Sequence, residues 1–129
     1  MEKKDLKPAG VFKYFEEICQ VPRPSKKEEK MIAYLKAFGA KHNLETKVDE
    51  AGNVLIKKPA TPGKENLQTV VLQSHIDMVC EKNNDVQHDF LTDPIETEID
   101  GEWLKAKGTT LGADNGIGVA TELAILAGD

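Results

Sequence analysis

The stretch that decides the fold is TVVLQSHID, which occupies residues 69–77. Its first part, residues 69–72, is a short apolar run typical of a strand covered on both faces. The run leads into His75 and Asp77, and side chains two positions apart on a strand point to the same face. Ligands of α/β sheets bind at the carboxyl ends of strands. We therefore predict an α/β fold with a candidate site at the end of this strand.

The segments on either side of this strand predict helices and two β-hairpins. Apolar residues at helical spacing predict a first helix that starts near Pro8 and stops before Pro22. A capping box of Ser25 and Glu28 opens a second helix. Alternation of apolar and polar residues predicts both hairpins, the second one with a tight Asp100-Gly101 turn. The second helix is predicted at about 25–42, and the two hairpins at 44–56 and 95–107. The sequence also predicts a long polar loop over 77–94 and a helix from 119 onward.

Length and composition describe one ordinary globular domain. The chain has 129 residues, a net charge of −5, 40% hydrophobic and 30% charged residues. No apolar run approaches the roughly 20 residues of a membrane helix, and no signal core follows the N-terminus, so we expect a cytoplasmic protein without a membrane partner. Cys19 and Cys80 lack CxxC or zinc-finger spacing, which predicts reduced thiols. An acidic chain without a basic patch argues against a nucleic-acid partner.

The His75–Asp77 pair allows two interpretations. A neutral imidazole is a good ligand for zinc, cobalt or manganese, and a nearby carboxylate can fix its tautomer and orientation. The other interpretation is a histidine that caps a strand end and is hydrogen-bonded to an ordinary aspartate. The residues alone leave both interpretations open.

A glycine-rich stretch, GADNGIG at residues 112–118, forms the second candidate site. Its glycines permit left-handed or crowded backbone and let a ligand approach Asp114 at the entry of a helix. Alternatively, Asp114 or Asn115 is simply the helix N-cap. The spacing fits neither a dinucleotide fingerprint nor a phosphate loop. A calcium loop also fails, because Leu111 and Ala113 occupy positions that need oxygen donors.

Other polar residues give weaker indications. The sequence has no HExxH motif, and Ser74 lacks the Gly-x-Ser-x-Gly context of a nucleophile. Cys80 is interpreted as a spectator thiol. His88 and Asp89 remain a candidate substrate-facing pair in the polar loop. His42 ends a helix, where the helix dipole explains it without a function.

Four motifs taken together resemble one family. They are VPRPS at 21–25, LQSHIDMV at 72–79, DGEW at 100–103 and GTTLGADNGIG at 108–118. In this order they resemble the aminoacyl-histidine dipeptidases, also called Xaa-His dipeptidases or peptidase D, in the group of co-catalytic zinc peptidases. The resemblance covers nearly the whole chain. It implies that residues 1–129 are the N-terminal portion of a three-layer α/β/α catalytic domain with a mixed sheet, without the lid or dimerisation domain.

The resemblance also implies roles for the site residues. His75 would ligate one metal ion, and Asp77 would be the catalytic residue that holds its imidazole and tunes the site. Asp114 would bridge two divalent ions, since its two carboxylate oxygens can each face one cation. Zinc is the expected metal, and cobalt or manganese would also suit these ligands. A cis peptide between Asp114 and Asn115 is expected.

The implied activity is hydrolysis of Xaa-His dipeptides, such as β-alanyl-histidine, by a metal-activated water. The general-base glutamate and further ligands of the family follow later than Asp129, and Glu122 is too early to replace them. We therefore expect this segment to be inactive alone and the full-length enzyme to be a homodimer. The alternatives are a related tripeptidase or N-acyl amidohydrolase, and, from another class, a non-catalytic α/β interaction module.

Overall fold

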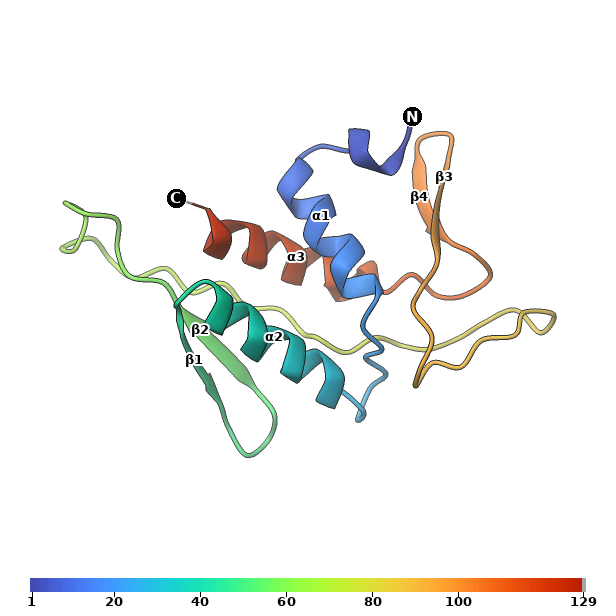
Figure 1. Cartoon of the computed structure of the whole chain (residues 1–129), viewed down its shortest axis with the longest axis horizontal. Coiled ribbons are helices and arrows are strands. Elements are labelled where there is room, and N and C mark those ends of the chain that lie inside the picture. Colours follow the sequence, from blue (N-terminus) through green and yellow to red (C-terminus); the bar gives the residue numbers. More distant parts are fainter. Residues whose placement is uncertain (129) are drawn as a thin grey trace.

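The structure is a computed structural model, which describes residues 1–128 (Figure 1). These residues form, in order, a short 3-10 helix η1 (Lys3–Asp5), α1 (Ala9–Cys19), α2 (Glu29–Lys41), β1 (Glu45–Val48), β2 (Val54–Lys57), β3 (Thr97–Asp100), β4 (Trp103–Ala106) and α3 (Ala113–Ala127). The α/β class, the helices and both hairpins are confirmed. No helix in this part of the chain combines the length and the apolar character needed to cross a membrane.

Each hairpin is a separate two-stranded antiparallel sheet. In the first, Val48 of β1 is opposite Val54 of β2. In the second, Asp100 of β3 is opposite Trp103 of β4. Gly101 has a φ of 63° in that turn, a left-handed conformation that glycine adopts without a steric penalty. The predicted Asp100-Gly101 turn is therefore confirmed.

The hydrophobic core lies mainly between helices. α1 packs along α3, as Figure 1 shows, and α2 packs on the β1–β2 hairpin. The largest fully buried side chains come from all three α-helices: Phe15, Ile18 and Cys19 from α1, Met31 from α2 and Leu123 from α3. The amphipathic patterns that predicted these helices are thus explained by burial of their apolar faces against one another.

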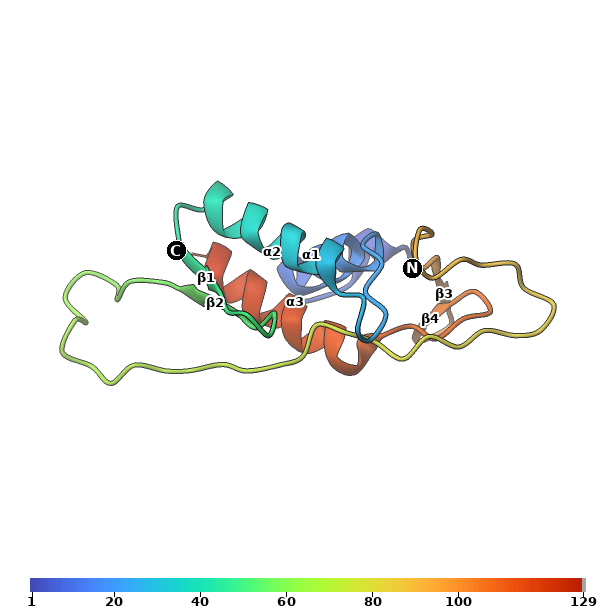
Figure 2. The same ribbon diagram turned by 90° about the horizontal axis from the view of Figure 1, so that it is seen from below.

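The predicted strand at 69–72 is wrong for the described residues. This segment is extended but belongs to neither sheet, and Figure 2 shows it as a single thread along the length of the molecule. Val70 and Val71 are 78% and 79% exposed. An apolar run becomes a buried strand only when neighbouring strands accept its backbone hydrogen bonds, and residues 1–128 offer none at this position. The expected mixed sheet and three layers are therefore not formed by these residues alone.

Beyond this thread, residues 77–94 form the expected long connection. Two isolated bridges anchor it: Pro24 pairs in parallel with Met78, and Lys82 pairs antiparallel with Thr109. Both bridges tie the connection to segments that flank the candidate site. The loop therefore places residues 75–78 beside the turn that precedes α2.

The capping box predicted for α2 is also wrong. The helix begins at Glu29, and Glu28 occupies the N-cap position without a capping side-chain bond. Glu28 Oε1 instead accepts a hydrogen bond from the Lys26 amide at 2.8 Å. Ser25 lies outside the helix because its hydroxyl bonds to the Asp77 carboxylate, a charged acceptor that forms a stronger hydrogen bond than a neutral one.

Candidate functional site

His75, Asp77 and Asp114 lie together in the structure. His75 and Asp77 stand at the end of the extended 69–77 segment, and Asp114 stands at the start of α3. His75 Nε2 is 3.0 Å from Asp114 Oδ1, although the two residues are 39 positions apart in the sequence. His75 Nδ1 is 3.1 Å from Asp77 Oδ1. The three candidate residues from two separate motifs therefore form one cluster.

Both ring nitrogens of His75 face carboxylates. The hydrogen bond with Asp114 raises the pKa of His75, and the backbone carbonyl and the charge of Asp77 act in the same direction. The side chain is 49% exposed, so solvent screens these charges in part. In the contact with Asp114, Nε2 carries the donated proton, because a carboxylate only accepts. With Asp77 holding the Nδ1 proton, loss of the Nε2 proton leaves a lone pair on Nε2 that points toward Asp114. His75 is thus oriented to present Nε2 as a ligand.

Asp77 is held between His75 and a residue from the loop before α2. Its Oδ1 faces His75, and its Oδ2 accepts a hydrogen bond from Ser25 Oγ at 2.5 Å. The Ser25 bond is the main reason that the pKa of Asp77 lies below its usual value, and His75 adds to the effect. Asp77 therefore remains an anion that can fix the imidazole. The spacing of Ser25 and Glu28 predicted a helix cap and gave no sign of this contact, although Ser25 belongs to the VPRPS motif.

Asp114 sits in a distorted entry to α3. Gly112 has a φ of 77°, and Asp114 and Asn115 have non-helical backbone angles within the first turn. The peptide bond between Asp114 and Asn115 is cis, as the family resemblance implied. Gly112 occupies the N-cap position of α3, without a capping side-chain bond. The Asp114 side chain is 96% exposed and uses Oδ1 for His75.

The donors present fit part of a metal site. A nitrogen and a carboxylate oxygen that both ligate one zinc ion at about 2.0 Å in tetrahedral geometry are about 3.3 Å apart. The 3.0 Å between His75 Nε2 and Asp114 Oδ1 is close to that separation. Residues 1–128 contain no group of three or more histidine, cysteine or acidic side chains arranged to hold a metal. Two ligands alone bind a cation weakly, so a metal site here would need donors besides His75 and Asp114.

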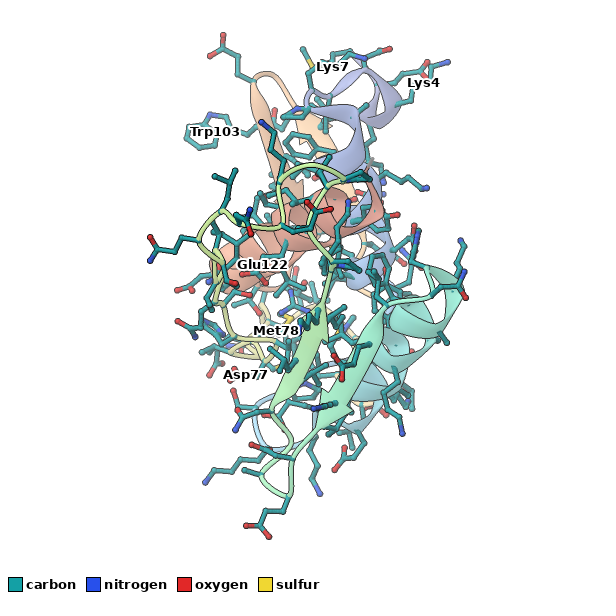
Figure 3. All side chains as sticks on the ribbon, turned by 90° about the vertical axis from the view of Figure 1, so that its left-hand side faces the viewer. Lys4, Lys7, Asp77, Met78, Trp103 and Glu122 are labelled. Carbon is teal, nitrogen blue, oxygen red and sulfur yellow. The ribbon has the colours of Figure 1, made fainter. Side chains whose placement is uncertain are left out.

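A further hydrogen bond ties the site segment to α3. Ser74 Oγ donates to Glu122 Oε2 at 2.8 Å. Figure 3 labels Glu122 together with Asp77 and Met78 of the neighbouring extended segment. Glu122, eight residues after Asp114 in α3, is thus a structural partner of Ser74. Trp103, labelled in the same figure, projects away from the ribbon and is 75% exposed.

The remaining candidates from the sequence do not join this cluster. Asp89 accepts a hydrogen bond from the Leu91 amide within its own loop. His88 stacks against Phe90, with ring centroids 4.5 Å apart. The ring of His42 lies 4.4 Å from that of Phe38. In the described residues, none of these histidines bonds to His75 or Asp114.

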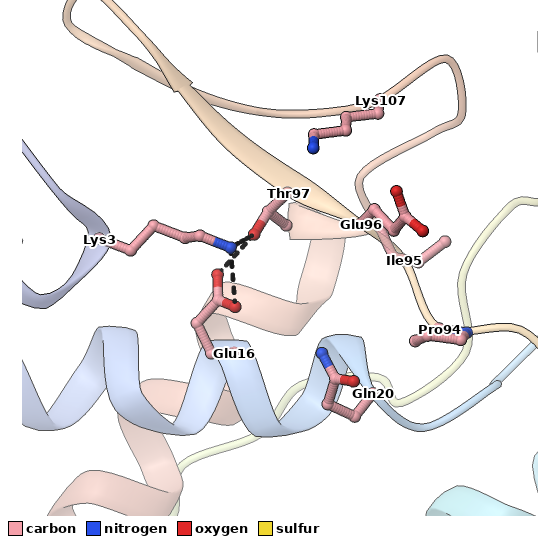
Figure 4. Close-up of a pocket in the computed structure, with 8 residues that line it drawn as sticks. All are labelled: Lys3, Glu16, Gln20, Pro94, Ile95, Glu96, Thr97 and Lys107. Carbon is pink, nitrogen blue, oxygen red and sulfur yellow. Dashed lines mark hydrogen bonds and ion pairs between the residues drawn. The ribbon is translucent and has the colours of Figure 1, made fainter.

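A cleft of about 240 Å³ lies elsewhere, between η1, α1 and the start of β3 (Figure 4). Three of the polar side chains that line it, Lys3, Glu16 and Thr97, pair with one another. Lys3 Nζ donates to Thr97 Oγ1 at 2.9 Å, and Thr97 Oγ1 donates to Glu16 Oε1 at 2.7 Å. Such mutual pairing is typical of a structural cluster, so we do not place the functional site in this cleft.

Comparisons with known proteins support the family resemblance. No family model matches the chain. Cytosol non-specific dipeptidase of Escherichia coli (strain K12) is 52% identical over 126 residues, which are 98% of this chain and 26% of that protein. The crystal structure of aminoacylhistidine dipeptidase from Vibrio alginolyticus has 54% identity and a TM-score of 0.95, over 99% of this chain and 26% of that one.

A tripeptidase structure from Staphylococcus aureus is 21% identical, with a TM-score of 0.72 over 91% of this chain and 31% of that one, and it shows similarity of fold alone. The chain therefore spans about a quarter of the length of the two more similar proteins. The resemblance to the aminoacyl-histidine dipeptidases is confirmed over this stretch.

Proposed function

We propose that this chain, which resembles the aminoacyl-histidine dipeptidases over about a quarter of their length, is the N-terminal portion of the catalytic domain of a metal-dependent dipeptidase. The observation that carries the proposal is the hydrogen-bonded contact between His75 Nε2 and Asp114 Oδ1. Two motifs that are specific only in combination meet there. A lone strand cap and a lone helix cap would have no reason to converge.

In the proposed site, His75 and Asp114 are metal ligands, and Asp77 orients the His75 imidazole and sets which nitrogen carries its proton. Two divalent cations, zinc or else cobalt or manganese, would supply Lewis acidity toward the peptide carbonyl and a water of lowered pKa. Asp77 keeps the proton of the imidazole on Nδ1, which leaves Nε2 free to ligate. Asp114 has a second carboxylate oxygen exposed to solvent, as a bridging ligand requires.

The general base and the remaining ligands would come from outside the described residues. Glu122, bonded to Ser74, is not proposed for that role. We therefore expect this chain alone to bind metal weakly and to be inactive. The proposed substrates of the complete enzyme are Xaa-His dipeptides such as β-alanyl-histidine, and the proposed setting is a cytoplasmic homodimer.

A chimera tests the proposal. Residues 1–126 of this chain replace the matching segment of the Escherichia coli dipeptidase, and hydrolysis of β-alanyl-histidine is measured with zinc, cobalt or manganese. We expect the chimera to be active and to lose activity on removal of metal by a chelator. His75→Ala and Asp114→Asn are expected to lower kcat/KM by more than the roughly 10- to 100-fold that follows loss of a group that only orients a ligand.

Two substitutions serve as matched controls. His42→Gln removes a histidine at the end of α2, and Asp85→Asn removes an exposed acid of the long loop. Both variants should keep the activity of the chimera. Cleavage of tripeptides or N-acyl amino acids in preference to dipeptides would favour a related hydrolase. An inactive chimera whose chain binds no cobalt would favour the non-catalytic interaction module.

A further inference from the structure

Arg23 is the only arginine in the sequence. Its side chain is buried, with 2% exposure. The hydrogen bonds of its guanidinium go to backbone carbonyls: Nη1 donates to Ile76 O at 3.2 Å and to Asp77 O at 3.4 Å, and Nη2 donates to Gly112 O at 2.7 Å. A buried cation is tolerated only where such partners replace water.

These carbonyls belong to the two segments that carry the candidate site. Ile76 and Asp77 directly follow His75, and Gly112 lies two residues before Asp114. The main chain of Arg23 is attached to the same place, since Arg23 O accepts a hydrogen bond from the Met78 amide at 3.0 Å. A planar guanidinium presents donors in several fixed directions at once, which the single ammonium of lysine does not. Arg23 therefore joins the two segments through one rigid group.

Two glycines leave room for the guanidinium. A Cβ atom at Gly112 would lie 2.5 Å from Arg23 Nη2, and a Cβ atom at Gly116 would lie 2.6 Å from the same nitrogen. Either distance is shorter than a van der Waals contact permits. Packing therefore also requires glycine at these two positions of the motif, because a side chain at either one would occupy the space of the Arg23 guanidinium.

We propose that Arg23 is a positioning residue for the metal site: its guanidinium, seated between Gly112 and Gly116, holds the segment of His75 and the segment of Asp114 at the separation that lets both residues ligate the same cation. Burial keeps the guanidinium away from solvent, so it does not contact substrate. This inference rests on the proposed function, because only a metal site at His75 and Asp114 needs that separation.

Three variants of this chain test the proposal: Arg23→Lys, Gly116→Ala and the combination of both. Gly10→Ala is the control, since a Cβ atom there would make an ordinary 3.7 Å contact with Ala124. Amide hydrogen exchange is measured without metal. Losing a charged hydrogen bond should speed exchange at Met78 and Gly116 about tenfold or more, while the amides of the β1–β2 hairpin keep their rates.

Metal affinity is the second measurement. Titration with cobalt, followed by its visible absorption, should show binding weakened roughly 10- to 100-fold in Arg23→Lys. Gly116→Ala should give a similar loss while retaining Arg23, which keeps the proposal testable if Arg23→Lys fails to fold. The double variant should lose little more than either single one, because both changes remove the same contact. Gly10→Ala should bind cobalt as the unmodified chain does.

Amide exchange that becomes faster by the same factor throughout the chain would overturn the proposal. The proposal would also be overturned if a variant exchanged faster at Met78 and Gly116 but bound cobalt with unchanged affinity. Fully additive losses in the double variant would also contradict it, since the glycine would then act independently of Arg23. Failure of the unmodified chain to bind any cobalt counts against the proposed function itself. The exchange rates at Met78 and Gly116 then decide separately whether Arg23 holds the two segments together.

Discussion

His75 and Asp77 each bond to two different residues through two different side-chain atoms. The imidazole of His75 meets Asp77 through one nitrogen and Asp114 through the other, and the carboxylate of Asp77 meets both His75 and Ser25. Each group thereby orients the next. The proton on His75 Nε2, between imidazole and Asp114, is the one that a cation would replace. Proton binding and metal binding at His75 therefore compete, which makes the protonation of this residue measurable evidence on the site.

Asp114→Asn is expected to lower the pKa of His75. The bond to Asp114 is the largest of the interactions that raise this pKa above 6.5 in the folded chain. A raised histidine pKa stabilises the fold at low pH, and this stabilisation is lost as pH rises through the folded value. NMR titration of His75 in the metal-free chain gives the pKa directly. Asp85→Asn is the control, and an unchanged pKa in Asp114→Asn would contradict the contact.

The two cysteines are expected to differ in reactivity and in their effect at alkaline pH. Burial raises the pKa of Cys19 from 9.0 to about 12. In the unfolded chain this thiol ionises near pH 9, so the unfolded state loses its proton first and stability falls as pH rises from about 9 to 12. Tyr34, whose pKa burial also raises, acts in the same direction.

Unfolding midpoints in urea between these pH values measure the effect, and Cys19→Ala should show a smaller decline with pH than the unmodified chain. Cys80 is less buried, so a thiol reagent should modify Cys80 in the folded chain and spare Cys19. Equal rates for both thiols would show that α1 does not bury Cys19 as described.

Packing between elements depends on a few close approaches. α2 lies on β1 near Gly39, where a Cβ atom would come within 3.0 Å of Thr46 Cβ and closer still to its hydroxyl. Thr46 is stiff because it is β-branched, and its hydroxyl bonds to Leu44 O at 3.1 Å. The side chain therefore cannot easily turn away. The helix and the hairpin reach their observed contact because position 39 has no side chain.

Gly39→Ala and Gly10→Ala are expected to change stability in opposite directions. Replacing a helical glycine by alanine ordinarily stabilises by up to about 1 kcal/mol, and Gly10 has room for the methyl group. At Gly39 the overpacking against Thr46 should outweigh this gain and destabilise by about 1–3 kcal/mol. Urea unfolding measures both changes. A stabilising Gly39→Ala would mean that α2 does not pack on β1 through this face.

At the scale of the whole molecule, a run of neighbouring apolar residues is exposed in the extended segment before the candidate site. Each α-helix buries several of its apolar side chains, whereas Leu67 and residues 70–72 expose theirs, and residues 70–72 belong to neither sheet. A flat, exposed and apolar strand is a template for pairing with another chain.

We expect this chain by itself to associate at micromolar concentrations through residues 67–72. Val71→Lys should reduce the association, because a charge on an exposed strand opposes pairing, and should leave the unfolding temperature nearly unchanged. Sedimentation velocity measures the association. Lys64→Ala, outside the apolar run, is the control substitution. Association that persists in Val71→Lys would place the contact on another surface.

Local patterns in the sequence were enough to predict much of the structure. Helical spacing predicted α1 and α2, alternation and the Asp100-Gly101 dipeptide predicted the hairpins, and residue chemistry marked the His75 and Asp114 motifs as candidates. These features depend on hydrogen bonds and periodicities between residues close together in the chain. The strand predicted at 69–72 was wrong because a strand needs a neighbouring strand, and its own sequence does not specify that neighbour.

Tertiary structure alone decided which of these groups meet. Nothing in the spacing of His75 and Asp114 required their contact across 39 positions. Ser25 has the local pattern of a helix cap, yet its hydroxyl bonds to Asp77. Arg23 has no local pattern, and only the folded chain shows its guanidinium between the two site segments. Residue type sets which chemistry a side chain can perform, whereas the path of the backbone sets the partners with which it performs it.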